Sequence, residues 1–180
     1  LTDVVRLARG VEIEARADHM TPELLRLLYR SRLRSLEMGI ESADETMLLK
    51  NRRVADEIDH LRAIVAEAHR IGVRVIGNYV LGLPGDDEGG MRRTIDFAKD
   101  LNTFAIQFTV CTPYPGTSTY RAVKDKIFDW NYESWTGWRP VFLHDKVSPE
   151  RLAKIREYAY VSYHLRPRYV YRFLKSIFLN

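Results

Sequence analysis

Residues 77–88 read Gly-Asn-Tyr-Val-Leu-Gly-Leu-Pro-Gly-Asp-Asp-Glu, and this stretch decides the fold class of the chain. Its first half is typical of a buried strand, and its acidic end is typical of a helix start. Between them Gly82, Pro84 and Gly85 favour a tight turn. Strands that pass directly into helices indicate a parallel α/β architecture. Ligands of such proteins bind beyond the carboxyl ends of the strands, so we expect this turn to lie beside a binding site.

The length and composition bound the class of protein. The 180 residues are 46% hydrophobic and 29% charged, which is typical of one soluble globular domain. The single cysteine cannot form an internal disulfide, and this favours a reducing, cytoplasmic location. A net charge of +4 permits anionic ligands but gives no strong nucleic-acid signal. Because the chain begins at Leu1 without an initiator methionine, we interpret it as the carboxyl-terminal part of a longer protein.

Four strand-like segments alternate with helical patterns. We predict strands over residues 11–16, 35–41, 73–81 and 104–112. Thr21 and Pro22 predict the start of the first helix, and Gly72 the end of the second. The apolar residues that recur at helical spacing after the second and third strands are Val54, Ile58, Leu61, Val65, Ala68 and Ile71, and then Met91, Ile95, Ala98 and Leu101.

The predicted strands alternate apolar and polar residues, whereas parallel strands between helices are usually apolar on both faces. The apolar face carries Val11, Ile13, Leu36, Met38, Ile40, Ile106, Phe108 and Val110. The polar face carries Glu12, Glu14, Arg16, Glu37, Gly39, Glu41, Asn78, Gln107, Thr109 and Cys111. If helices cover the apolar face, the polar face lines a barrel. Buried charges are costly unless paired or bound to a ligand, so these side chains form either ion pairs, such as Arg16 with Glu14 or Glu41, or a site.

Four parallel strands are too few to close a barrel. The sheet would be left with two open edges, which favour aggregation. We therefore expect further strands upstream of Leu1.

Three motifs, in this order, closely resemble those of the radical S-adenosylmethionine (radical SAM) enzymes. They are Gly39-Ile40-Glu41-Ser42 with the later pair Arg52-Arg53, the stretch from Asn78 to Gly85, and Pro113-Tyr114-Pro115-Gly116-Thr117. The resemblance covers about residues 11–120. It implies an α/β fold, a partial TIM-like (β/α)6 barrel, of which residues 1–125 supply the last four parallel strands with their helices. Residues 126–180 would form a C-terminal extension, first irregular and then helical.

The resemblance also implies residues that bind S-adenosyl-L-methionine. Glu41 matches a polar residue beside the methionine and ribose parts of the cofactor, and Asn78 matches one that bonds the ribose hydroxyls. Arg53 matches a basic residue that pairs with the methionine carboxylate, since a guanidinium fork fits a carboxylate. If the resemblance holds, Arg53→Ala should weaken cofactor binding about ten- to a hundredfold, whereas the control variant Arg52→Ala should not.

Four further residues complete this implied site. Val80 and Gly82 match the apolar surface under the adenine. Arg16 lies near the cofactor-contacting residues of its strand, and Thr109 is expected on the same concave face as Arg16, Glu41 and Asn78.

The family's iron–sulfur cluster (4Fe-4S) requires a Cys-x3-Cys-x2-Cys loop after the first barrel strand. The chain has one cysteine, Cys111, which is interpreted as a small buried hydrophobic residue. We assign no metal ligand in this sequence. The cluster would be bound by an upstream segment, and the chain alone would be inactive.

The tail resembles the end of radical SAM enzymes that carry an amino-terminal cobalamin-binding domain. Ser148 and Pro149 predict the start of a helix there. This similarity implies cobalamin in an upstream domain and a small-molecule or lipid-like substrate. A basic aromatic run follows, which is a solvated amphipathic face or a surface that touches membrane lipid or RNA. Its residues are Arg166, Arg168, Tyr169, Tyr171, Arg172, Phe173 and Lys175.

Three functions compete for this sequence. The first is part of a radical SAM enzyme, in which an external reductant drives cleavage of S-adenosylmethionine to start radical chemistry on an organic substrate. That chemistry includes cobalamin-dependent methylation or the modification of a ring or lipid. The second is a non-catalytic half-barrel that binds an adenosyl ligand or another subunit. The third is a parallel-barrel enzyme that uses Glu14, Glu41 and Arg16 for acid–base catalysis.

Overall fold

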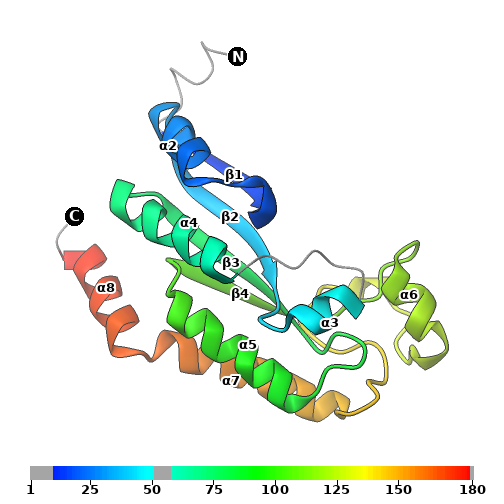
Figure 1. Cartoon of the computed structure of the whole chain (residues 1–180). Coiled ribbons are helices and arrows are strands. Elements are labelled where there is room, and N and C mark those ends of the chain that lie inside the picture. The colour runs from blue at the N-terminus through cyan, green and yellow to red at the C-terminus, as the bar shows by residue number, and fades with distance from the viewer. Residues whose placement is uncertain (1–9, 51–57, 179–180) are drawn as a thin grey trace.

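The computed structural model describes residues 10–50 and 58–178 as one parallel sheet with helices packed on it (Figure 1). The strands are β1 (Val11–Arg16), β2 (Leu33–Glu41), β3 (Arg74–Leu81) and β4 (Ala105–Val110), paired in that order. All three pairings are parallel. The sequence-based prediction of a partial TIM-like barrel is confirmed. β1 has the predicted bounds, β2 begins two residues earlier, and β3 and β4 are shorter than predicted.

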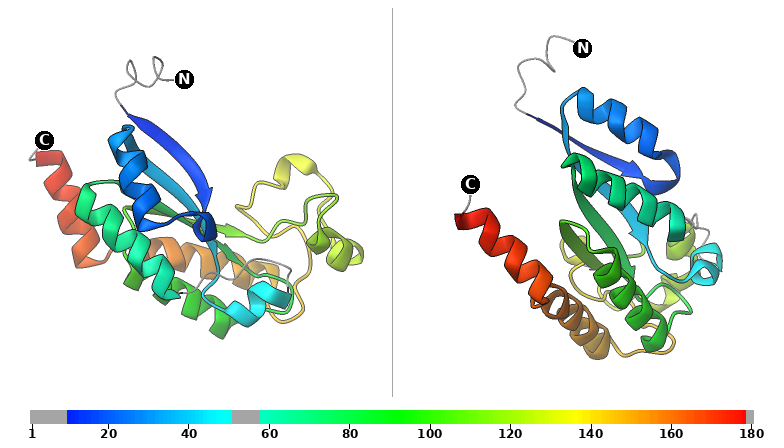
Figure 2. Two further views of the ribbon diagram at one scale, coloured as in Figure 1. Left: turned by 45° about the horizontal axis from the view of Figure 1, so that its top comes forward. Right: turned by 60° about the vertical axis from the view of Figure 1, so that its left-hand side comes forward.

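The helices follow the strands in chain order. They are α2 (Pro22–Arg30), α3 (Glu45–Lys50), α4 (Ile58–Ile71), α5 (Glu88–Leu101) and α6 (Ser118–Val123), followed by α7 (Pro149–His164) and α8 (Pro167–Phe178). Short 3-10 turns occur at Ala17–His19, Lys124–Lys126 and Tyr132–Ser134. Helices α2, α4 and α5 cover one face of the sheet, and α7 continues this layer beside β4 (Figures 1 and 2).

Side-chain caps fix where these helices begin. The predicted cap Thr21 accepts a hydrogen bond from Leu24 N, and Ser148 accepts one from Arg151 N. Asp87 caps α5 in the same way by accepting from Gly90 N. Each cap satisfies a backbone N–H that the helix itself leaves without a partner. Between β2 and α4 the structure also has the short helix α3, which was not predicted. Val54 of the predicted apolar repeat and the arginines 52 and 53 lie outside the described residues.

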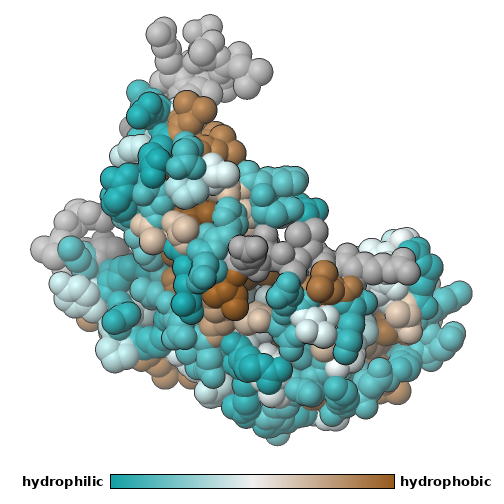
Figure 3. Space-filling view, viewed as in Figure 1, coloured by the Kyte–Doolittle hydropathy of each residue, from teal (hydrophilic) through white to brown (hydrophobic). Residues whose placement is uncertain are grey.

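The register confirms the predicted division of the sheet into two faces. Side chains of the apolar face meet the helices, and those of the polar face within the strands are partly or fully exposed. Cys111, which was assigned to the polar face, is buried just beyond the end of β4. Helical residues that share this core include Leu61, Ile64, Val65 and Ala68 of α4 and Met91, Ile95 and Ala98 of α5. At its centre the ring of Tyr79 lies 5.2 Å from that of Phe108. The helical surface seen in Figure 3 is mostly hydrophilic, as expected for a layer with one buried side.

The outer edge of β4 is covered, which corrects the expectation of two open sheet edges. The Tyr160 hydroxyl of α7 accepts a hydrogen bond from Phe108 N of β4 at 3.2 Å. Arg156 Nε donates to Phe108 O at 3.1 Å, and Val110 N donates to Gly137 O at 2.7 Å. Trp138 stacks on Tyr160 with the Arg156 guanidinium above it. Residues of the extension therefore take the place of a neighbouring strand.

Candidate functional site

The carboxyl ends of the four strands bring the predicted site residues onto one face of the sheet. Arg16 is in register with Gly39, Gly39 with Asn78, and Val80 with Thr109. The carboxylate of Glu41 lies over Gly39, since its Oε1 would be 3.7 Å from a Cβ atom built there. These residues therefore share one face of the sheet, and the binding of the cofactor by that face stays a prediction. Arg53 lies outside the described residues.

Glu41 ends β2 in a strained turn. Its φ is +69°, and Ser42 N donates to Ile40 O at 2.9 Å. A three-residue turn with a positive φ at its centre is a γ-turn of the rare, strained kind. It coincides with the register shift between Gly39 and Glu41. Because strain of this sort clusters at binding and catalytic sites, the turn marks Glu41 as a functional candidate.

Helix α5 holds this turn in place through Thr94. The buried Thr94 hydroxyl lies 3.1 Å from Ser42 Oγ and accepts from Ala43 N at 3.2 Å. Beside it, Arg93 pairs with Asp44 at 3.2 Å. Several bonds from a rigid helix therefore oppose relaxation of the backbone at Glu41.

Asn78 of β3 carries an unsatisfied acceptor at the centre of the site. Its Nδ2 donates to Glu37 Oε1 at 2.8 Å, so β2 fixes the amide. Its Oδ1 is buried and has no hydrogen-bond partner among the described residues. An unpaired buried oxygen is costly, and a ligand hydroxyl would supply the missing donor.

Arg16 is committed to a local ion pair. Its Nε and Nη2 donate to the two carboxylate oxygens of Asp18 at 2.9 and 2.6 Å. This hydrogen bonding holds the pKa of Asp18 below its usual range. The pair with Asp18 differs from the partners considered from sequence, Glu14 and Glu41, because the chain turns back directly after β1 at Ala17–His19.

Gly82 is required by the turn and by helix α7. It has φ +72°, and a Cβ atom there would lie 2.8 Å from Leu152 Cδ2. Glycine is thus needed for a left-handed conformation and for close approach of α7. The structure thus gives Gly82 a packing role. Its expected place under the adenine of the cofactor stays a prediction.

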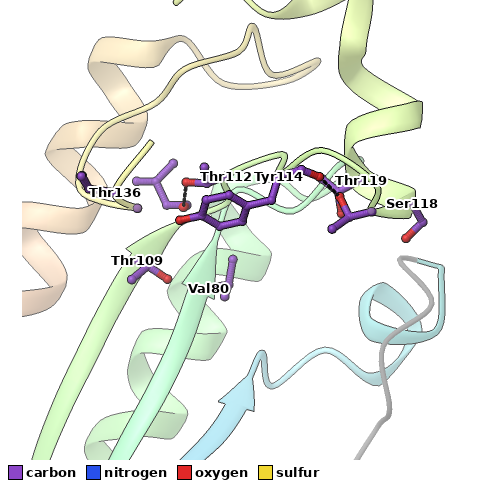
Figure 4. Close-up of a pocket in the computed structure, with 10 residues that line it drawn as sticks. Val80, Thr109, Thr112, Tyr114, Ser118, Thr119 and Thr136 are labelled. Carbon is purple, nitrogen blue, oxygen red and sulfur yellow. Dashed lines mark hydrogen bonds between the residues drawn. The ribbon is translucent and has the colours of Figure 1, made fainter. Parts of the chain in front are cut away.

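A cavity of about 340 Å³ opens beside Val80 and Thr109 (Figure 4). The ring of Tyr114 lies across it, and the Tyr114 hydroxyl donates to Trp135 O at 2.8 Å. The other lining residues are Val110, Thr112, Thr117, Ser118, Thr119, Thr136 and Gly137. The cavity is therefore bounded by strand ends, by the predicted Pro-Tyr-Pro-Gly-Thr turn, and by part of the extension.

The extension contributes two residues that sequence analysis missed. Thr136 and Gly137 line the cavity, although no motif singled them out. Their only sequence signal was proximity to three tryptophans, of which Trp135 is buried. Thr109 itself donates to Tyr79 O at 3.2 Å, so its hydroxyl is engaged with the strand.

Cys111 is buried in a second apolar cluster below the cavity, as its small-hydrophobe interpretation requires. It follows the end of β4 and does not lie within the strand, and Cys111 N donates to Leu81 O at 2.9 Å. Within residues 10–50 and 58–178, no group of three His, Cys, Asp or Glu side chains could hold a metal ion.

Asp86 lies buried in the turn between β3 and α5. Burial raises its pKa to about 6, although its carboxylate accepts a hydrogen bond from Asp87 N at 2.8 Å. The exposed neighbour Asp87 behaves oppositely, because its bond from Gly90 N lowers its pKa.

The pKa of Asp86 predicts a pH-dependent loss of stability. Because the pKa of Asp86 in the folded state lies above the usual aspartate value of 3.8, the folded state binds the proton more tightly, and stability falls as pH rises from about 4 to about 6. Asp86→Asn has no carboxyl group to titrate, so it should not show this loss. Its free energy of unfolding should therefore rise by about 1–3 kcal/mol relative to that of the wild type as pH goes from about 4 to about 6. Urea unfolding across this range measures it. Asp87→Asn is the control and should show no such gain; a pH-independent difference for Asp86→Asn would contradict the assignment.

No family model matches the chain. Two curated relatives are similar in sequence. An uncharacterized methyltransferase of Pyrococcus horikoshii is 31% identical over 145 residues, which are 78% of this chain and 30% of that protein. Bacteriochlorophyllide d C-12(1)-methyltransferase of Chlorobaculum tepidum is 24% identical over 131 residues, 73% of this chain and 29% of that protein. The chain thus spans about 30% of the length of these relatives.

Solved structures share the fold at low sequence identity. Coproporphyrinogen III oxidase of Escherichia coli, a radical SAM enzyme, matches with a TM-score of 0.65 and 16% identity over 85% of this chain and 32% of its own. The chain has the fold of a radical SAM barrel. Elp3 of Methanocaldococcus infernus matches with a TM-score of 0.66 and 15% identity, over 93% of this chain and 36% of its own. The radical SAM methyltransferase TsrM of Kitasatospora setae, with cobalamin and a [4Fe-4S] cluster bound, matches with a TM-score of 0.56 and 15% identity, over 63% of this chain and 23% of its own.

Proposed function

We propose that this chain is the cofactor-binding carboxyl-terminal part of a radical SAM enzyme. The observation that carries the proposal is the group at the strand ends, where the strained Glu41 and the unsatisfied Asn78 Oδ1 face the same side of the sheet. The shared fold and the predicted motifs support it. In this proposal S-adenosylmethionine and an iron–sulfur cluster held by an upstream segment supply the radical chemistry.

The residues of this chain bind and orient the cofactor. Asn78 Oδ1 accepts from a ribose hydroxyl, which satisfies a buried oxygen that otherwise has no donor among the described residues. Glu41 lies beside the methionine and ribose parts. Val80 and Thr109, at the floor of the cavity in Figure 4, lie under the adenine. Arg16 stands at the rim, Gly82 shapes the turn, and Arg53 pairs with the methionine carboxylate.

The reaction we propose is a methyl transfer to a small-molecule or lipid-like substrate. Both curated relatives are methyltransferases, and the structurally similar TsrM carries cobalamin. We infer cobalamin in an upstream domain of the whole protein and an external reductant as its partner. The enclosing turn and extension limit access of water to the reacting groups.

Asn78→Leu should weaken S-adenosylmethionine binding about tenfold or more, because a hydrophobic side chain of similar size removes the acceptor. Equilibrium titration of the reconstituted full-length protein measures the affinity. The matched control is Glu14→Gln, on the same face of β1 but before the strand end, which should bind as tightly as the wild type. Equal affinity in Asn78→Leu would remove Asn78 from the site.

A further inference from the structure

The end of the chain is basic and contains no acidic residue. From Tyr158 to Asn180 there is no Asp or Glu, whereas four Arg and Lys residues occur. In α8 the basic residues Arg168, Arg172 and Lys175 follow one another at spacings of four and three, which places them along one side of the helix. The rest of the described helix surface is mostly apolar, so α8 is amphipathic.

Tyr169 and Arg172 attach α8 to the rest of the described structure. The Tyr169 ring lies 5.7 Å from Tyr163 and 4.7 Å from His164. Arg172 Nη2 donates to the carbonyls of Thr103 and Phe104 at 3.0 and 2.8 Å. These contacts satisfy backbone oxygens between α5 and β4 and hold α8 against the molecule.

The outer surface is apolar and exposed. Tyr171 is 70% exposed, Phe173 54%, Leu174 46% and Val170 40%. Leu165, where α7 passes into α8, is also exposed. Figure 2 shows α8 as an arm that leaves the end of α7 and runs along the outside of the molecule. Four large apolar side chains on one short helix exceed the scattered exposure normal for a soluble surface.

We propose that α8 binds the surface of an anionic phospholipid bilayer. The apolar side chains enter the region between headgroups and acyl chains. Arg168 and Lys175, three residues before and four residues after the exposed Tyr171, border this apolar surface and contact the lipid phosphates. Within the described part of the chain, no helix is long and apolar enough to cross a membrane, so α8 lies in the plane of the surface. The basic charge of the segment favours an anionic partner. Its exposed aliphatic residues favour a broad apolar phase, which a bilayer offers and an acidic protein groove does not.

The same chemistry argues against RNA as the partner. Basic and aromatic residues serve RNA through charge and base stacking. Leu174 and Val170 add exposed aliphatic surface, which contributes nothing to stacking and is stabilised by acyl chains. The inference rests on α7 and α8 alone and holds whether or not the strand ends bind S-adenosylmethionine.

Vesicle flotation of the intact protein tests this inference. We expect binding to vesicles of phosphatidylcholine with phosphatidylglycerol, and much weaker binding to phosphatidylcholine alone or at high NaCl. Arg168→Gln combined with Lys175→Gln should weaken binding about thirtyfold, because each charge near the surface contributes about a fivefold factor. Tyr171→Ser combined with Leu174→Ser should weaken it about tenfold or more.

A matched pair elsewhere on the surface controls for general stickiness. Leu27 and Leu143 are 58% and 53% exposed, and their replacement by serine should leave vesicle binding unchanged. Near-ultraviolet circular dichroism verifies that every variant is folded. Equal loss in the control pair, absence of vesicle binding by the wild type, or binding of single-stranded RNA without binding of vesicles would each overturn the proposal.

Discussion

Gly82→Ala is expected to destabilise the protein by about 2–5 kcal/mol. A residue with a side chain pays about 1–2 kcal/mol for the left-handed conformation that Gly82 adopts at φ +72°. The added Cβ would also lie 2.8 Å from Leu152 Cδ2 in the buried contact with α7, and overpacking of this kind costs about 1–3 kcal/mol more. The free energy of unfolding in urea measures the sum.

Gly85→Ala separates the two contributions. Gly85 has φ +86°, but nothing lies within 4 Å of a Cβ built there, so its replacement should cost only the conformational part, about 1–2 kcal/mol. Leu152→Ala removes the obstructing side chain. The double variant Gly82→Ala with Leu152→Ala should therefore lose less stability than the two single variants lose together. If Gly82→Ala and Gly85→Ala lost equal amounts of stability, close packing of α7 against the turn would contribute nothing to the effect at Gly82.

Glu41→Gly is expected to lower cofactor affinity while leaving stability equal or higher. Glycine adopts the φ of +69° without strain, so the free energy of unfolding should rise by up to about 1 kcal/mol. Loss of the carboxylate should weaken S-adenosylmethionine binding about ten- to a hundredfold, the usual value of a charge-assisted hydrogen bond. Urea unfolding and cofactor titration of the full-length protein give the two quantities.

Arg32→Gly is the matched control for this variant. Arg32 has a similar φ of +72°, but it lies at the start of β2, the end opposite to the site. Its replacement should relieve the same backbone strain without changing cofactor binding. Equal affinity in Glu41→Gly and the wild type would assign the turn a purely structural role.

The strands and their two faces could be predicted because local signals agreed with the tertiary structure. Alternating residues such as Ile106, Gln107 and Phe108 reveal which side meets the helices. Caps at Thr21 and Ser148 locate two helix starts. The site candidates Glu41, Asn78 and Thr109 could be placed on one face because parallel strands end at the same edge of a sheet.

Other features depended on contacts between distant segments. The bond from Val110 N to Gly137 O and the lining of the cavity by Thr136 join residues that no local pattern relates. The pairing of Arg16 with Asp18 follows from the short turn after β1, which the sequence did not signal. Gly82 was recognised as conformationally special, but its close contact with Leu152 depends on where α7 packs.

The covered edge of β4 makes the two edges of the sheet unequal as places where a further strand could pair. Tyr160, Arg156 and Gly137 occupy hydrogen-bonding groups that a neighbouring strand would otherwise use. Another chain therefore cannot polymerise onto that side without first displacing α7. Among the described strands, β1 forms the other edge of the sheet. A strand that extends this described sheet, from the same polypeptide or from a second one, is therefore expected to pair with β1.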